Sequence, residues 1–364
     1  MIDDADAGGQ TPLCEKLIDA LMEGWGALTA LSPKEFGGKA GKEPLPQRAY
    51  LLFNRWDGNP LAQELCEQFP KWARDRISVP DSYFEYHEER APCLLELPEE
   101  LVVSVPGFRT RDLREWLAHC LAFASQQVNE RVTKQDFCGV VISSESAQAI
   151  TRYWVGLGDQ RPPHKEERVL FRFQDPRVMQ RVWHALSPLQ QSRWLGPVTQ
   201  WWSLMQPWGP FGDRPEPARW FCAKAPVLPY GTKADGSPRD LFDEAQWFLS
   251  GVSPDANSIW RSYAKHNIPP EAQPDPGSLQ QMLADAARMN LKNLDLEDYV
   301  WITWMHAPKE GPARAMDWSL PHLASALSQI EDQLRDRPEA SFSMLLNKII
   351  QPQKKISHGL QEPL

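Results

Sequence analysis

Two periodicities divide the chain into a part where strands alternate with helices and a part that is helical. Short alternating or continuous apolar runs predict strands at 49–54, 93–97 and 137–142. Apolar residues at helical spacing predict helices around these strands, at 12–31, 60–69, 113–124 and 147–155. Strands that alternate with helices predict an α/β lobe over 48–205, with a mixed sheet flanked by helices.

The pattern changes after residue 205. Prolines recur between 206 and 240, so this stretch has room for a short strand at 219–223 but for no long helix, and we interpret it as a Pro-rich connector. Helical spacing then predicts an all-helical C-terminal lobe over 241–350, with helices at 241–249, 279–289, 296–305 and 320–334. We expect 1–47 to be a helical extension with a flexible loop, and 351–364 to be a loose tail.

The segment around residue 172 has the most distinctive pattern. Phe171 and Phe173 alternate with Arg172, as in a strand with one buried face. Asp175 then suits a helix N-cap, because its carboxylate can accept hydrogen bonds from the first N–H groups of a helix. Pro176 suits the first helical position, which needs no N–H. The sequence therefore predicts a strand, a sharp capped turn and an amphipathic helix.

The run 172–177 reads Arg-Phe-Gln-Asp-Pro-Arg, and Leu-Gly-Pro at 195–197 and a Trp pair at 201–202 follow it. This combination resembles the Tap/TEC family of type VI secretion adaptor chaperones, in which an RFxDPR-like element closes the N-terminal lobe and an LGP-like element comes after it. The resemblance extends over roughly 48–310. It implies a structural role for six motif residues, Phe171, Phe173, Asp175, Pro176, Gly196 and Pro197.

The resemblance also implies a function. Proteins of this family are non-enzymatic chaperones of the bacterial cytoplasm that bind a type VI effector and help load it onto the VgrG spike. The part of the effector that needs shielding would be its N-terminal, PAAR or apolar segment, since exposed apolar surface promotes aggregation. We expect no cofactor and no metal, because the sequence contains no metal-binding or phosphate-binding motif.

Composition and charge narrow the choice of partners and compartment. The 364 residues exceed the size of one typical core, and the net charge of −9 argues against a nucleic-acid partner. Acidic residues gather between 81 and 100, where we interpret them as a solvated face, with an interaction patch as the alternative. Six scattered cysteines without a CxxC pair, no secretory signal and no membrane-length apolar run indicate a cytoplasmic protein without stable membrane insertion.

No motif for catalysis or metal binding is present. The sequence has no HExxH and no GxSxG, and the Gly- and Lys-rich stretch at 37–42 lacks the spacing of a phosphate-binding loop. An enzyme is therefore not indicated. The 16 tryptophans leave one alternative open, a carbohydrate-binding or carbohydrate-active protein that uses Trp platforms.

The candidate partner-binding residues are Arg172, Arg177, Trp194, Trp201 and Trp202. Arg172 either forms an ion pair with Asp175 or Glu166 that holds the turn, or makes a bidentate contact to a carboxylate of the partner. We place the adjacent tryptophans on a helix, where neighbouring side chains diverge. One of them would then pack in the core, and the other would anchor an effector helix.

Overall fold

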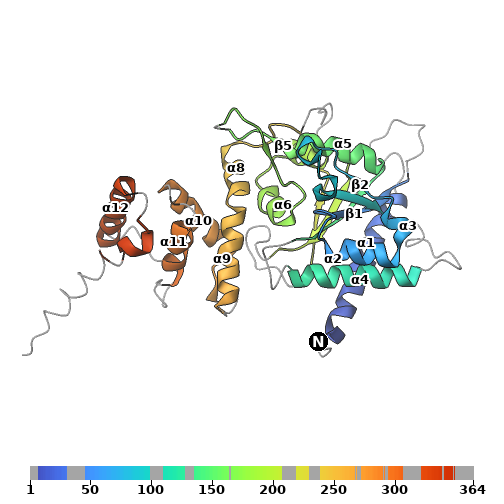
Figure 1. Cartoon of the computed structure of the whole chain (residues 1–364), viewed down its shortest axis with the longest axis horizontal. Helices are drawn as coiled ribbons and strands as arrows, with labels where there is room; N and C mark the ends of the chain where they lie inside the picture. Colours follow the sequence, from blue (N-terminus) through green and yellow to red (C-terminus); the bar gives the residue numbers. More distant parts are fainter. Residues whose placement is uncertain are drawn as a thin grey trace, which may run out of the picture. The chain divides into compact units, whose positions relative to one another are not determined.

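The computed structural model describes residues 7–30, 46–98, 110–127, 135–163, 165–206, 219–228, 238–266, 268, 272–289, 291, 294–305, 321–337, 340–346 and 348. These residues form two compact units, one up to Gly251 and one from Val252 onward. The first unit contains a sheet flanked by helices and the second is helical, as the sequence predicts (Figure 1).

A six-stranded antiparallel sheet is the frame of the first unit. Its strands lie in the order β2 (Ile77–Ser78), β3 (Cys93–Glu96), β1 (Arg48–Phe53), β4 (Phe137–Ser143), β7 (Gln200–Leu204) and β8 (Trp220–Lys224). All neighbouring strands of this sheet pair antiparallel, so the prediction of a mixed sheet is wrong. Alternation of strands with helices does not fix strand direction, because a helix can return the chain to either end of a sheet.

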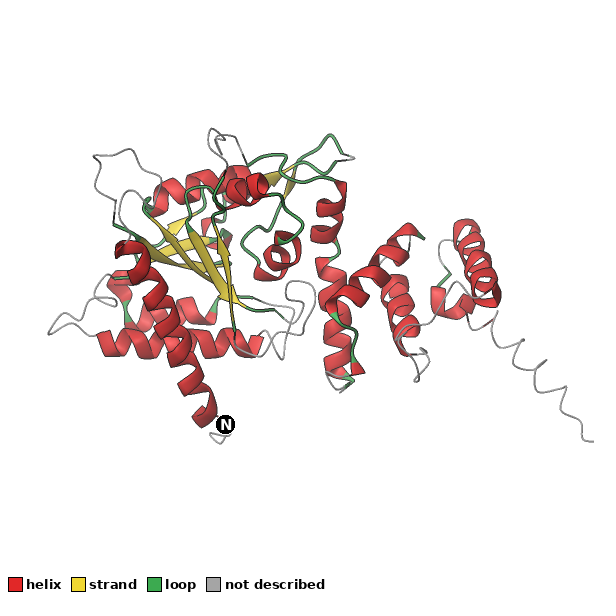
Figure 2. Ribbon diagram, turned by 180° about the vertical axis from the view of Figure 1, so that it is seen from behind, coloured by secondary structure: helices red, strands yellow, loops and turns green. Residues whose placement is uncertain are grey.

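Helices cover both faces of the sheet, and alternate residues of β1 pack with different layers (Figure 2). Ala49, Leu51 and Phe53 belong to one core, whereas Tyr50 and Leu52 belong to the other. The first layer contains α1 (Ala7–Ala30), α2 (Pro60–Gln68), α3 (Pro70–Ala73) and α4 (Thr110–Gln126). The second contains α5 (Ala147–Gly158), α6 (Pro176–Trp183), α7 (Pro188–Leu195) and α8 (Glu244–Gly251). The unit is therefore a three-layer sandwich.

A bulge in β4 shifts the alternation of its side chains by one residue. Leu52 pairs with Gly139 but Phe53 pairs with Phe137, so Cys138 is the extra residue. Gly139 has a φ of 129°, and a Cβ at this position would lie 2.0 Å from the carbonyl oxygen of Trp202 on β7. Only glycine permits this close approach of β4 and β7.

The second unit consists of the helices α9 (Ser253–Lys265), α10 (Pro276–Arg288), α11 (Leu294–Met305) and α12 (Pro321–Asp336), in which α11 packs against α9 and α10. The indole N–H of Trp304 donates to the carbonyl of Ala272 at 2.7 Å, and the rings of Tyr299 and Phe342 meet edge-on with centroids 5.6 Å apart. The described residues of this unit contain no strand, which agrees with the predicted helical lobe.

The two units divide later in the chain than the predicted connector. Strand β8 lies within the predicted 206–240 connector and completes the sheet, and α8 belongs to the first unit although its residues fall in the predicted helical lobe. The predicted loop after residue 31 and the predicted tail at 351–364 lie outside the described residues. Helix α1 has 24 residues, but neither it nor any other described helix is long and apolar enough to cross a membrane.

Candidate functional site

The central motif leaves a two-stranded ribbon just before residue 171. Strand β6 (Val169–Leu170) pairs with β5 (Asp159–Gln160) outside the main sheet, so the strand predicted here is shorter than its alternating pattern. The N–H of Phe173 bonds to the carbonyl of Phe171 at 2.9 Å, which turns the chain away from the ribbon. The alternation still holds beyond the ribbon, because Phe171 and Phe173 are buried and Arg172 is exposed.

Asp175 caps helix α6 and also forms an ion pair with Arg177. Its Oδ1 accepts from the backbone N–H of Arg177 at 3.0 Å and from Nε at 2.8 Å, and its Oδ2 lies 2.5 Å from Nη2. Pro176 occupies the start of the helix, as predicted. Burial raises the pKa of Asp175, but the hydrogen bonds and charge of Arg177 outweigh it and hold the pKa below its ordinary value.

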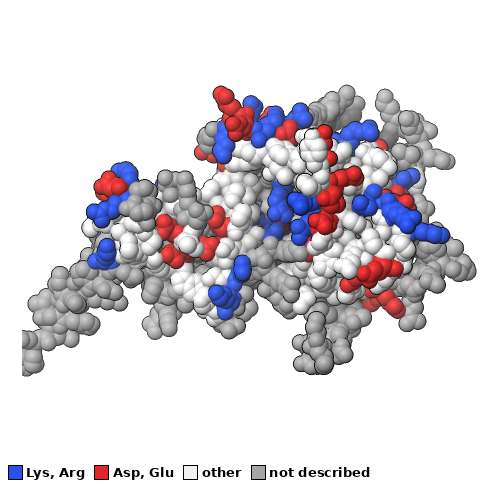
Figure 3. All heavy atoms as spheres, in the orientation of Figure 1, with Lys and Arg blue, Asp and Glu red and all other residues white. Residues whose placement is uncertain are grey.

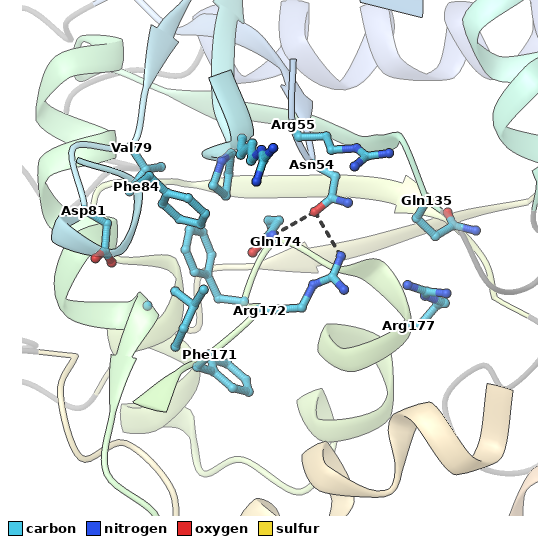
Figure 4. Close-up of a pocket in the computed structure, with 15 residues that line it drawn as sticks. Asn54, Arg55, Val79, Asp81, Phe84, Gln135, Phe171, Arg172, Gln174 and Arg177 are labelled. Carbon is cyan, nitrogen blue, oxygen red and sulfur yellow. Dashed lines mark hydrogen bonds between the residues drawn. The ribbon is translucent and has the colours of Figure 1, made fainter. Parts of the chain in front are cut away.

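Arg172 does not form the predicted ion pair with Asp175 or Glu166. Its Nη2 donates instead to Oδ1 of Asn54 at 3.3 Å, and Nε2 of Gln174 donates to the same oxygen at 2.8 Å (Figure 4). The nearby Arg177 folds back onto Asp175 from the first turn of α6, which leaves the exposed guanidinium of Arg172 to reach across to the end of β1. Asn54 therefore orients Arg172.

These residues line a pocket of about 440 Å³ within the first unit. Its walls come from the end of β1, the residues around η1 (Ser82–Phe84) and η2 (Glu88–Arg90), the end of α5 and the central motif. Several polar side chains lie on one side of the pocket, whereas the acid Asp81 lies on the same side as apolar side chains. Figure 4 shows Arg55, Gln135 and Arg177 towards one side and Val79 and Phe84 towards the other. The pocket can therefore receive a polar and an apolar group side by side.

The pocket is positively charged. Its lining includes four arginines, Arg55, Arg90, Arg172 and Arg177, and one acid, Asp81. Arg177 is neutralised by Asp175, but among the described residues no carboxylate lies within salt-bridge distance of the other three arginines. In the space-filling view, basic side chains gather next to acidic ones near the middle of this face of the first unit (Figure 3). Such a site attracts anions.

Two polar residues of the pocket lining, Asp81 and Gln135, differ in whether their side chains have hydrogen-bond partners among the described residues. Asp81 caps η1 by accepting from the N–H of Tyr83 at 3.0 Å, and burial raises its pKa. Gln135 is 1% exposed, and its Nε2 has no hydrogen-bond partner among the described residues. A buried donor without a partner costs free energy, so a ligand that accepts from it would be favoured. The described residues bring no three His, Cys, Asp or Glu side chains together as metal ligands.

Trp201 and Trp202 lie on strand β7, so their predicted position on a helix is wrong. Pairing with β4 and β8 fixes them as strand residues, and successive strand side chains point to opposite faces. Trp201 is fully buried in the second layer, 5.6 Å from Trp154 between ring centroids. Trp194 on α7 is also fully buried, beside Phe171. A partner could reach these two rings only if the core opened.

Trp202 is half-buried beneath the N-terminal helix α1. A Cβ on Gly24 of that helix would lie 2.8 Å from Cζ2 of Trp202, and Trp220 donates its indole N–H to the carbonyl of Leu17 at 2.9 Å. The surface where we expected an effector helix is thus covered by a helix of the chain itself. The exposed large hydrophobic residues of the described chain include no tryptophan.

Gly196 and Pro197 form the turn between α7 and β7. Gly196 has a φ of 58°, and a Cβ there would lie 2.2 Å from Cε1 of Tyr153. The hydroxyl of Tyr153 donates to the carbonyl of Arg193 at 2.7 Å, and the hydroxyl of Ser143 donates to that of Pro197 at 2.6 Å. These contacts tie the turn to α5 and to the end of β4.

Sequence reasoning misses several residues that line the pocket, namely Asn54, Arg55, Phe84, Arg90 and Gln135. Three of them follow β1 or precede β4 and lack any local motif. The other two lie in the acidic stretch interpreted as a solvated face. Glu85 and Glu88 are exposed as expected, but Asp81 is buried. Three aromatic residues occur among these acids, but Tyr83 and Tyr86 are exposed and only Phe84 lines the pocket.

Residues 49–193 match the model of a family described as a domain of unknown function (DUF4123). The match runs from β1 to α7 and includes Arg172 and Arg177. No curated protein and no solved structure matches the chain. This family is known as a chaperone or adaptor domain associated with type VI secretion, and it is not a known enzyme family. Over residues 49–193, the chain is therefore similar to this family.

Proposed function

We propose that this chain is a non-enzymatic adaptor that binds a type VI secretion effector through the arginine-lined pocket and helps load it onto the VgrG spike. The observation that carries this proposal is the place of the central motif. It lies inside the family match, and Arg172 and Phe171 form part of the pocket wall. The family association supports an adaptor, and the pocket supports a location for its contact with the effector.

The geometry of the pocket suits recognition of a protein segment. Its volume falls within the range of ligand-binding pockets, and a few oriented polar groups face an apolar wall. Asn54 orients Arg172, and the buried rings of Phe171 and Phe173 anchor the backbone on both sides of it. A preorganised arginine loses little conformational entropy on binding, and arginine is enriched among the residues that dominate protein interfaces.

The segment that binds is the N-terminal, PAAR or apolar part of the cognate effector, held in the cytoplasm before secretion. The apolar wall around Val79 and Phe84 would receive an apolar side chain of that segment. The proposed transfer of the effector to VgrG is based on the family resemblance. The second unit contributes no residue to the pocket, so we assign the contact with VgrG to it. No turnover is part of this function.

Co-purification tests the proposal. Tagged full-length chain is co-expressed with each candidate effector encoded beside a VgrG gene in the source genome, as wild type, Arg172→Gln and Arg152→Gln. Arg152 is an exposed arginine of α5 outside the pocket and serves as the matched control. We expect wild type and Arg152→Gln to retain one effector, and Arg172→Gln to retain about ten-fold less. Failure of wild type to retain any candidate would contradict the adaptor role.

A further inference from the structure

We propose that the pocket recognises a side-chain carboxylate next to an apolar side chain on a peptide segment of its partner. This inference rests on the proposed function for the identity of the partner, but the chemistry of the ligand follows from the pocket alone. The acid and the apolar side chain would enter the pocket together. The acid would lie towards the arginines, and the apolar side chain would lie towards Val79 and Phe84.

The charge of the pocket calls for an anion. Arg55, Arg90 and Arg172 line one pocket without a carboxylate in salt-bridge range among the described residues. Guanidinium groups that line the same pocket repel one another, so an anion bound in the pocket would relieve that repulsion. Arginine also presents paired N–H groups whose spacing fits the two oxygens of a carboxylate.

The pocket is built to hold one of these arginines in place. The Oδ1 of Asn54 accepts from Arg172 at 3.3 Å and from Gln174 at 2.8 Å, which fixes the side from which the guanidinium faces the pocket. Behind it, the buried pair of Arg177 and Asp175 consumes one positive charge and supports the turn. Gln135 adds a buried amide nitrogen that has no partner in the described part of the chain.

The other anion commonly bound by arginines is a phosphate group, and the pocket suits it less well. Phosphate sites typically add a glycine-rich loop, a helix N-terminus or a lysine. The described lining contains no lysine and a single glycine, Gly158, at the end of α5. Its apolar residues, including Val79, Phe84 and Phe171, form a wall that a phosphate would leave unused. A peptide that carries both an acid and an apolar side chain uses both sides.

Capped dipeptides test this inference directly on the full-length chain. The probes are N-acetyl-Phe-Glu-amide, its Phe-Gln counterpart, and N-acetyl-Phe-Gln with a free C-terminal carboxylate, each titrated by ligand-observed NMR. We expect the glutamate probe to bind wild type and Arg152→Gln about ten-fold more tightly than the capped glutamine probe, a difference of about 1.4 kcal/mol. Arg172→Gln should bind both capped probes equally. Arg55→Gln, a second pocket variant, should weaken the glutamate probe as well.

Three results would overturn the inference. The first is equal binding of the two capped probes to wild type, and the second is displacement of the glutamate probe by inorganic phosphate at equal concentration. The third is tightest binding of the probe with the free terminal carboxylate, which would mean that the pocket recognises the C-terminus of a peptide. The outcome is separable from the proposed function. If the capped glutamate probe binds as expected while Arg172→Gln still retains the effector, the pocket binds carboxylates but the effector binds at another site.

Discussion

Asp175 and Arg177 form a closed unit at the start of helix α6, in which one carboxylate accepts from both the backbone and the side chain of the same arginine. The two charges are buried together, with side-chain exposures of 5% and 7%. This pairing leaves Arg172, the other arginine of the motif, without an ion pair among the described residues. The motif thus supplies two arginines to the pocket wall, one in a buried ion pair and one without an ion pair in the described part of the chain.

Asp175→Ala should lower the free energy of unfolding by about 3–5 kcal/mol, because it removes a helix cap and leaves a buried arginine without its counter-ion. Arg181, buried one turn further on, also loses a favourable charge, since burial lowers its pKa to about 10 and Asp175 opposes that effect. Chemical denaturation measures the change. Arg172→Gln is the control and should stay within about 0.5 kcal/mol of wild type.

The contribution of Asp175 should depend on pH in a defined direction. The folded-state pKa of this carboxyl is lowered, so its stabilising effect is present above the unfolded-state pKa of about 4 and disappears as pH falls through the folded-state value. The difference in unfolding free energy between wild type and Asp175→Asn should be constant from about pH 7 to pH 5 and shrink below about pH 4. A difference that grows on acidification would contradict the ion pair.

Gly196→Ala should destabilise the first unit strongly. The backbone at this position is in the left-handed region, which costs other residues about 1–3 kcal/mol, and the new Cβ would meet the ring of Tyr153 at 2.2 Å. Gly251→Ala is a matched control, because a Cβ there meets nothing within 4 Å. Thermal melts should show a clear loss for the first variant and little change for the second. Equal melts would show that the turn relaxes.

Gly24→Ala should loosen helix α1 although alanine is the better helix former by about 1 kcal/mol. The new Cβ would lie 2.8 Å from Trp202, so the helix or the ring must move. Hydrogen exchange of the α1 amides should become faster in this variant. Adding Trp202→Phe, which removes the crowding atom, should restore part of the protection. Slower exchange in Gly24→Ala would mean that propensity outweighs the contact.

The periodicity of apolar residues and the capping residues predict the elements whose formation depends on neighbouring positions in the sequence. The strand β1 was predicted to within one residue at each end, and the cap formed by Asp175 and Pro176 at the right residues, because periodicity and capping chemistry act within a few positions. Trp201 and Trp202 were misplaced, since five residues of β7 carry too little periodicity to separate a strand from a helix, and pairing with β4 decides.

The pocket could not be predicted in the same way. Asn54 and Arg172 are 118 residues apart in the sequence. Gln135, which lines the same pocket, follows α4 and precedes β4. Antiparallel pairing of β1 with β4 brings these segments together, whereas the sequence pattern predicted a mixed sheet. The motif itself contains Arg172 and Arg177, which line the pocket, but it does not predict the residues around them.

Site-specific photo-crosslinking tests most directly whether the pocket binds the effector. A benzophenone amino acid replaces Phe84 on the pocket wall in one full-length variant and Arg152 on the exposed side of α5 in another, and each is irradiated in cells that make the cognate effector. We predict a covalent adduct with the effector from position 84 and none from position 152, with the crosslinked effector peptide carrying an acid beside an apolar residue. An adduct from position 152 with none from position 84 would contradict the pocket as the effector-binding site.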